Sequence, residues 1–299
     1  MNKNSTETVA VGALSHSVDP ALIETKGELY GTMSWNTNRR IAMEVSIQGY
    51  KQPFKIPLDW LDRGGNNTWA YIYYLLHLFV NEEGSLVDTT TREGIELVME
   101  EPATAGQYLF RPRQVRERFT WRVGPQGNRK QGVKARGGDD ASSVATSMSG
   151  PQGRFAKAVN GRDYKCIITN EYESCQAAHL VPKSRTDVYE ELLHEDFDFS
   201  PEYPYRVSYG VLLQSHLHKQ YDDYAWSFYT KENDDNYYVH AFDEKSASGR
   251  YHGKIIPRIR FSLASETWEL PDKRLCEWHY TQCIVQNLRG FASSPRISP

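Results

Sequence analysis

The N-terminal half of the chain shows the alternation that a half-buried β-strand requires. Ile41, Met43, Val45 and Ile47 alternate with small or polar residues, so one face of a strand over 41–47 would be apolar. Residues 57–61 end near a turn signal at 62–65, and the apolar stretch 69–80 could be a buried helix or two strands. We predict a β-rich N-terminal domain.

The C-terminal half has a different pattern, in which short apolar strands and helices alternate. Strand patterns are followed by turn residues, and the last helix pattern has Pro271 at its start and Gly290 just past its end. The predicted elements are a helix ending at 155–161, strands at 166–169, 175–181 and 211–213, a helix at 215–223, strands at 226–230 and 237–242 around a turn at 233–236, and a helix at 272–288.

A change in composition separates the two halves. Between Gly124 and Gly153, glycine, serine, glutamine and small charged groups replace the aromatic residues, a composition that buries too little apolar surface to order itself. We predict an α+β protein with a β-rich N-terminal domain over 1–123, a flexible linker over 124–153, and a C-terminal domain over 154–299.

Composition limits the class of protein. With 39% hydrophobic and 12% aromatic residues the chain can build a core, and four cysteines are too few for a disulfide scaffold. The first residues are polar and no apolar stretch approaches the roughly 20 residues needed to cross a bilayer. We expect an intracellular protein, cytoplasmic or nuclear, without a membrane partner.

The chemistry-bearing residues lie in the C-terminal half. His179 ends a predicted strand, and His218 and Asp222 stand four residues apart on the helix that follows the next strand. An imidazole and a carboxylate on one helix face can hold a metal ion together, and a histidine at a strand end can take a proton from water. Strands followed by such a helix are the order that a ββα-metal site requires.

The motifs around these residues resemble the HNH endonuclease domain found in many predicted fungal proteins. The matching blocks, in chain order, are Arg162-Asp163, Cys166 to Thr169, AAHLVP at 177–182, GVLL at 210–213, Leu217-His218 and Tyr221-Asp222. The resemblance covers around 90 residues. It implies an HNH-like ββα-metal module in which His179 is the general base, His218 a metal ligand, Asp222 the acidic position after it, and Mg²⁺ or another divalent cation the cofactor.

Two positions depart from the pattern of the family. The asparagine that orients the base histidine falls at Tyr209, whose long ring cannot copy a short amide, and Ser208 is the nearby small polar substitute. Many HNH enzymes also place an aspartate directly before the base histidine, where this chain has Ala178. The metal would then depend on His218, Asp222, water and substrate oxygens.

The other candidate residues have a structural interpretation as well as a functional one. Lys183 and Arg185 follow the base strand and could contact a phosphate, although most such charges are simply solvated. Cys276, His279 and Cys283 recur at helical spacing, which indicates a core-facing stripe rather than a metal cluster. The remaining candidates are read as structural: His216, His240 as packing or a second layer around the site, and Cys166 and Cys175 as buried thiols.

Three functions remain open. The first is a divalent-metal-dependent nuclease, which requires the imidazoles of His179 and His218 to lie a few ångströms apart across a shared cleft. The second is an HNH-derived module that only binds. The third is a scaffold in which Tyr209 and His179 act on a small molecule. Charge weighs against nucleic acid as a partner, because residues 154–299 contain 18 lysines and arginines but 21 aspartates and glutamates.

Overall fold

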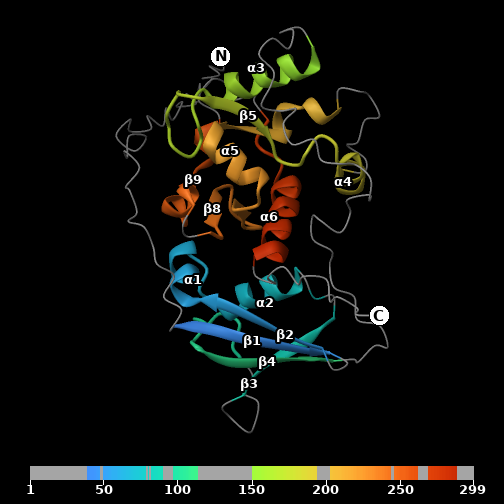
Figure 1. Ribbon diagram of the computed structural model, residues 1–299, viewed down its shortest axis with the longest axis vertical. Helices are drawn as coiled ribbons and strands as arrows, with labels where there is room; N and C mark the ends of the chain where they lie inside the picture. The colour runs from blue at the N-terminus through green and yellow to red at the C-terminus, as the bar shows by residue number, and fades with distance from the viewer. Residues whose placement is uncertain are drawn as a thin grey trace, which may run out of the picture.

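A computed structural model describes residues 39–47, 50–78, 80, 82–89, 97–113, 150–193, 203–243, 246–261 and 269–287 (Figure 1). The predicted linker lies almost wholly outside these residues. Residues 151–153, which we assigned to its end, form the first turn of a helix. The described part is a mixed α+β structure with several sheets and six α-helices. None of these helices combines the length and the apolar character needed to span a bilayer.

The N-terminal half contains a four-stranded sheet with the strand order β2-β1-β4-β3. Its strands are β1 (Arg40–Ile47), β2 (Tyr50–Pro57), β3 (Gly84–Asp88) and β4 (Gly106–Pro112). The alternation predicted for 41–47 is confirmed, because Ile41, Met43 and Val45 are buried on one face of β1. β1 pairs antiparallel with β2 and parallel with β4.

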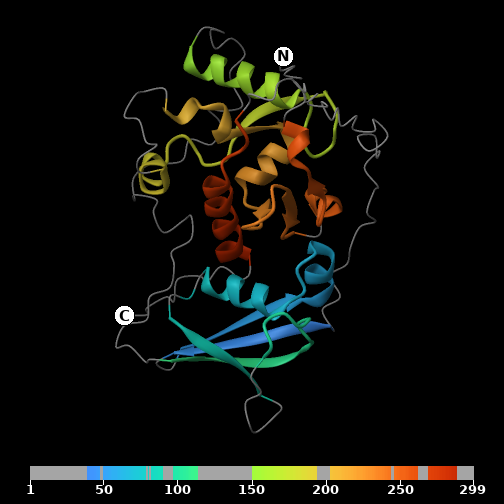
Figure 2. The same ribbon diagram turned by 180° about the vertical axis from the view of Figure 1, so that it is seen from behind.

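Two helices cover this sheet on the side that faces the rest of the molecule (Figures 1 and 2). They are α1 (Leu58–Gly64) and α2 (Trp69–His77). The turn predicted at 62–65 is the end of α1, which stops at Gly65 with a left-handed φ of 75°. The choice left open for 69–80 resolves as a helix, whose N-terminus is capped by the Thr68 side chain accepting from the Tyr71 amide.

The C-terminal half is built around a two-stranded hairpin between two helices. It comprises α3 (Pro151–Asp163), β5 (Cys175–His179), β6 (Gly210–Gln214) and α5 (Ser215–Asp222), and α4 (Thr186–Leu193) lies in the long connection between the strands. β5 and β6 pair antiparallel, with His179 opposite Gly210. In both ribbon views, α3 lies on one side of β5 and α5 on the other (Figures 1 and 2).

The strand predicted at 166–169 is wrong. Cys166, Ile167 and Ile168 are buried as the apolar pattern indicates, but they form a turn closed by the Asn170 amide donating to the Cys166 carbonyl at 2.9 Å. Asn170 adopts a positive φ of 63°, which reverses the chain. A run of four apolar residues does not distinguish a buried strand from a buried turn, so the first strand of the hairpin is β5 rather than this segment.

The remaining predicted elements are confirmed in place. β7 (Trp226–Thr230) and β8 (Tyr237–Ala241) form an antiparallel pair, extended by the short β9 (Ile255–Ile256). The last helix is α6 (Lys273–Asn287). Its first turns place Leu275 and Cys276 in the core of the C-terminal half, whereas Tyr280 and Ile284 belong to the core of the N-terminal half. α6 therefore joins the two cores (Figure 1).

Candidate functional site

The two faces of the β5–β6 hairpin carry different side chains. Successive residues of a strand point to opposite faces, and residues paired across two strands share a face. Ala177 and its cross-strand partner Leu212 pack with Phe155 of α3. Ala178 and its partner Val211 belong to the other core cluster, together with Leu217 of α5. One face of the hairpin therefore meets α3 and the other meets α5.

His179 lies on the α3 face. Its ring stacks on Phe155 with a centroid distance of 4.2 Å and an interplanar angle of 16°, and meets Tyr205 edge-on at 5.9 Å. Its cross-strand partner must be glycine, because a Cβ at Gly210 would come within 2.3 Å of the Phe155 ring. The side chain is half-buried. The histidine is thus held in one orientation by aromatic rings at the end of a strand.

His218 lies on α5 against the opposite face of the hairpin. Its Nδ1 is 3.1 Å from Oε1 of Gln176, and its Nε2 is 3.5 Å from Oδ2 of Asp222. The side chain of His218 is 18% exposed and that of Asp222 is 53% exposed. The predicted pairing of His218 and Asp222 on one helix face is therefore seen, and the pair is open to solvent.

The shared cleft expected between His179 and His218 is not formed. Gln176, which contacts His218, and His179 are three residues apart on β5, so their side chains point to opposite faces. At the rise of a strand, their Cα atoms are also about 10 Å apart. The expectation assumed that β5 follows a first strand at 166–169, and pairing β5 with β6 instead separates the two imidazoles.

Comparison with known protein families identifies this region. A family model described as HNH endonuclease matches residues 166–229, a span that contains His179, His218 and Asp222. This part of the chain is therefore similar to HNH endonuclease domains, and residues 166–229 are called the HNH domain below. No curated protein and no solved structure matches the chain. The family indicates a nuclease-type function in general, and HNH domains generally use a divalent metal ion.

The residues of the HNH domain offer a small donor set for such an ion. Ala178, at the position where many HNH enzymes have an aspartate, is fully buried on the α5 side of the hairpin and carries no donor atom. Within the described residues, no three or more His, Cys, Asp or Glu side chains gather as a metal site would require. His218 supplies one imidazole nitrogen and Asp222 one carboxylate, and Mg²⁺ often takes one or two carboxylates from a protein while it keeps several waters.

Tyr209 serves the HNH domain through its backbone. Its carbonyl accepts from the Leu180 amide at 2.8 Å, next to His179, while its buried ring packs 5.5 Å from that of Tyr189. Ser208, the small polar substitute considered above, donates its hydroxyl to the Glu269 carboxylate at 2.7 Å. The side chain of Tyr209, at the asparagine position, is thus occupied by packing, and that of its neighbour Ser208 by a hydrogen bond to Glu269.

Arg185 is committed to a local contact. It donates to both carboxylate oxygens of Asp187, at 2.9 and 2.7 Å, and its guanidinium lies 5.3 Å from the Trp278 ring centroid. The Asp187 contact raises the pKa of Arg185 and lowers that of Asp187. Lys183, the other candidate phosphate contact, is exposed in the turn after β5.

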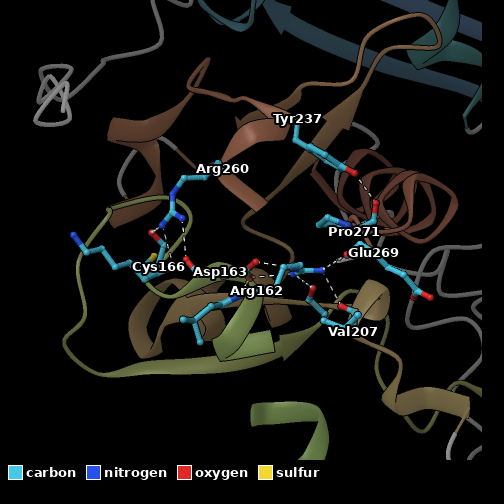
Figure 3. A network of polar contacts seen from close by, with 11 residues as sticks. Arg162, Asp163, Cys166, Val207, Tyr237, Arg260, Glu269 and Pro271 are labelled. Atoms are coloured by element: carbon cyan, nitrogen blue, oxygen red, sulfur yellow. Dashed lines mark hydrogen bonds and ion pairs between the residues drawn. The ribbon is translucent and has the colours of Figure 1, made fainter. Parts of the chain in front are cut away.

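A buried ion pair supports the hairpin from the α3 side, and its role was not foreseen from the sequence. The Arg162 guanidinium donates to both oxygens of Asp163 and to the carbonyls of Val207, Gly210 and Glu269 (Figure 3). Asp163 also accepts from the Leu212 amide at 2.7 Å. The pair therefore fixes the start of β6, which is the strand opposite His179. From the sequence, Arg162-Asp163 could be recognised only as part of a motif. Its structural role could not be predicted, because the carbonyls that Arg162 contacts are distant in sequence.

The other histidines and cysteines named above are mainly structural. The stripe of Cys276, His279 and Cys283 faces the core, as predicted, and all three are buried. All four cysteines are free: Cys166 is buried as expected and Cys175 is half-buried. His216 is exposed on α5. His240 is buried at the junction of the two halves, where both ring nitrogens have partners.

Proposed function

We propose that the chain is a divalent-metal-dependent endonuclease in which His179 is the general base. The observation that carries the proposal is the order β5, β6, α5 inside the matched segment, with His179 last on the first strand and His218 on the helix. These are the positions to which the family resemblance gives the base and a metal ligand. The imidazole is half-buried with its Nε2 covered, and the stacking on Phe155 keeps its orientation while it accepts a proton.

His218 and Asp222 are the residues that would hold the ion, Mg²⁺ or a similar cation. When bound, such an ion neutralises charge on the phosphate. The shared cleft expected from the sequence is not formed, because this pair and His179 lie on different faces of the hairpin. We therefore give up that requirement and assign them different tasks. His179 acts on the water at the scissile phosphate, and the pair anchors the neighbouring backbone. Loss of His179 should therefore lower kcat, whereas loss of His218 should raise KM and the metal concentration required.

A second function has one observation in its favour. Ala178 stands where many HNH enzymes have an acidic ligand, and it is buried with Val211 and Leu213 in the apolar core under α5. An HNH module with this core can retain its fold without any ion. This supports a domain that binds a partner or a small molecule without cutting phosphodiester bonds.

Cleavage assays separate the two functions. The full chain is incubated with plasmid DNA and with single-stranded RNA in Mg²⁺, Mn²⁺ or EDTA. A nuclease should cut in a metal-dependent manner, and His179→Ala should lower kcat by about 10²–10⁴-fold. His216→Ala, an exposed histidine on the same helix as His218, is the matched control and should cut at the wild-type rate.

The outcomes are distinct. Cutting that persists at full rate in His179→Ala removes the base assignment. Equal metal dependence in wild type and in His218→Ala removes the ion assignment. Absence of cutting on every substrate and metal, with the protein folded, supports the non-cleaving module instead.

A further inference from the structure

The segment from Tyr164 to Ser174, which joins α3 to β5, exposes two large aromatic side chains. Tyr164 is 61% exposed and Tyr172 is 54% exposed, although large apolar side chains are normally covered. Their rings meet edge-on at 5.0 Å, and Nζ of Lys165 lies 4.5 Å from the Tyr172 ring centroid. Two tyrosines and a lysine therefore form one surface group, which we call the tyrosine platform.

The backbone holds this platform in an unfavourable conformation. Tyr164, Asn170 and Ser174 have φ values of 63°, 63° and 53°, and they are three of the four non-glycine residues with positive φ in the described part of the chain. Bulky residues such as tyrosine are seldom found with positive φ. Such conformations persist where the surrounding structure enforces them, and they concentrate at functional sites. Because the rings of Tyr164 and Tyr172 are exposed, their burial does not offset the energetic cost of these positive φ values.

Two cations fix the platform from below. Arg260 donates to the carbonyls of Asp163, Lys165 and Cys166, at 2.8, 3.2 and 3.2 Å. Lys254 donates to the Ile168 carbonyl at 2.6 Å. Figure 3 shows the Arg260 guanidinium pointing toward Asp163 and Cys166. Both side chains are largely buried, and burial lowers the pKa of each.

The charge around the platform is slightly positive although the whole chain is acidic. The segment itself carries Lys165 against Glu171 and Glu173, and Lys254 and Arg260, which contact it from another part of the chain, bring the balance to three cations against two carboxylates. Glu171 is engaged with the Gln214 amide at 2.7 Å. The surface thus combines exposed aromatic faces with a local excess of cations.

The platform is connected to the hairpin at its His218 end. Ser174 accepts from the amide of Ser215, the first residue of α5, at 2.8 Å. Two residues after Ser174, Gln176 contacts the His218 ring. The platform segment therefore adjoins the end of the hairpin that carries His218.

We propose that the tyrosine platform binds single-stranded nucleic acid, with bases stacking on Tyr164 and Tyr172 and phosphates drawn to Lys165 and the cations beneath. Stacking on aromatic rings is how proteins hold unpaired bases without sequence preference, since every base has a π face. A duplex hides those faces, so the platform selects single strands. The inference rests on the proposed function for its substrate class, and it adds which form of nucleic acid is bound and where.

Binding is measured on the full chain by fluorescence anisotropy with a labelled 12-nucleotide DNA strand, the RNA strand of the same sequence, and the DNA duplex, all in EDTA. We expect both single strands to bind more tightly than the duplex. Tyr164→Ala and Tyr172→Ala should each weaken single-strand binding about tenfold. Tyr172→Phe, which keeps the ring, should bind as wild type does. Lys165→Gln should flatten the salt dependence of binding by about 0.7 in slope.

The controls keep this inference separate from the proposed function. Met99→Ala changes an exposed apolar residue in the N-terminal half and should leave binding unchanged. Unaltered single-strand binding in the Tyr164→Ala, Tyr172→Ala double variant, or a preference for duplex, would overturn the platform even if the protein cuts. Tyrosine-dependent binding without any cutting in Mg²⁺ or Mn²⁺ would leave the platform standing and remove the nuclease proposal.

Discussion

The histidines at the junction of the two halves are buried, whereas those at the hairpin, His179 and His218, are partly open to solvent. At the junction, Nε2 of His240 contacts the Gly64 carbonyl at 3.1 Å and its Nδ1 contacts the Tyr280 hydroxyl at 2.8 Å. Nε2 of His252 contacts the Trp60 carbonyl at 2.8 Å, and its Nδ1 accepts from the Ala241 amide at 3.1 Å. A carbonyl only accepts, so both rings carry a proton on Nε2, and His252 is neutral because its Nδ1 accepts from an N–H.

The surroundings of a histidine, rather than the residue type, therefore decide what its ring can do. Burial lowers the pKa of His252 to about 4 and that of His240 well below its usual value, so both remain neutral and serve as fixed links between the halves. His179 is half-buried and His218 is 18% exposed. Both are partly open to solvent and lie in the segment that matches the HNH family.

The largest effect should follow loss of Trp60 at the junction. This buried ring packs beside His252 at 5.3 Å, and its indole N–H donates to the Ala241 carbonyl at 2.8 Å. Trp60→Ala should lower the free energy of unfolding by about 3–5 kcal/mol, which urea titration measures. Met99→Ala, at an exposed site, should change it by less than about 0.5 kcal/mol. A small effect of Trp60→Ala would mean that the halves do not depend on this contact.

Acid should weaken the junction next. A histidine whose folded pKa is lowered takes up a proton more readily when unfolded, so stability is complete above about pH 6.5 and falls as pH decreases toward the folded pKa. For His252 the fall should be about 2 kcal/mol between pH 7 and pH 5. Urea midpoints across this range measure it, and His252→Gln should show a shallower decline. Parallel curves for the two proteins would rule out His252 as the titrating group.

Removing one hydroxyl at the junction should have an intermediate effect. The Tyr280 hydroxyl bonds to both His240 and the Tyr71 hydroxyl. Tyr280→Phe leaves His240 with Tyr71 as its remaining hydroxyl partner at 3.1 Å, so we expect a loss of about 1 kcal/mol in the free energy of unfolding. Thermal or urea unfolding provides the measurement. A loss as large as that of Trp60→Ala would show that the hydroxyl network is a single cooperative unit.

The smallest effect on stability should come from the hairpin. His218 is bonded to Gln176 and near Asp222 at the surface, where such contacts contribute little. His218→Ala should change the free energy of unfolding by less than about 0.5 kcal/mol. Comparison with Tyr280→Phe under the same conditions tests the contrast between the two regions. Equal destabilisation would place His218 among the structural histidines.

The sequence predicted most elements because local patterns set them. The alternation at 41–47, the strands at 226–230 and 237–241 and the helix ending near residue 287 depend on periodicity and end signals. The turn at 166–170 was missed because burial alone does not define a strand. The sequence identified the candidate residues but not the face of the hairpin on which each lies. That depends on the pairing of β5 with β6 across a long connection, which no local pattern encodes. The ends of the domains remain predictions.

The position of α6 sets the order in which this protein can mature. Tyr280, Ile284 and Val285 fill the core of the sheet formed by residues 40–112, and Tyr71 meets Tyr280 across 209 positions of sequence. During synthesis, part of the apolar core of the N-terminal half therefore stays uncovered until α6 has left the ribosome. Premature termination before Tyr280 would therefore yield not a smaller stable protein but one prone to aggregation.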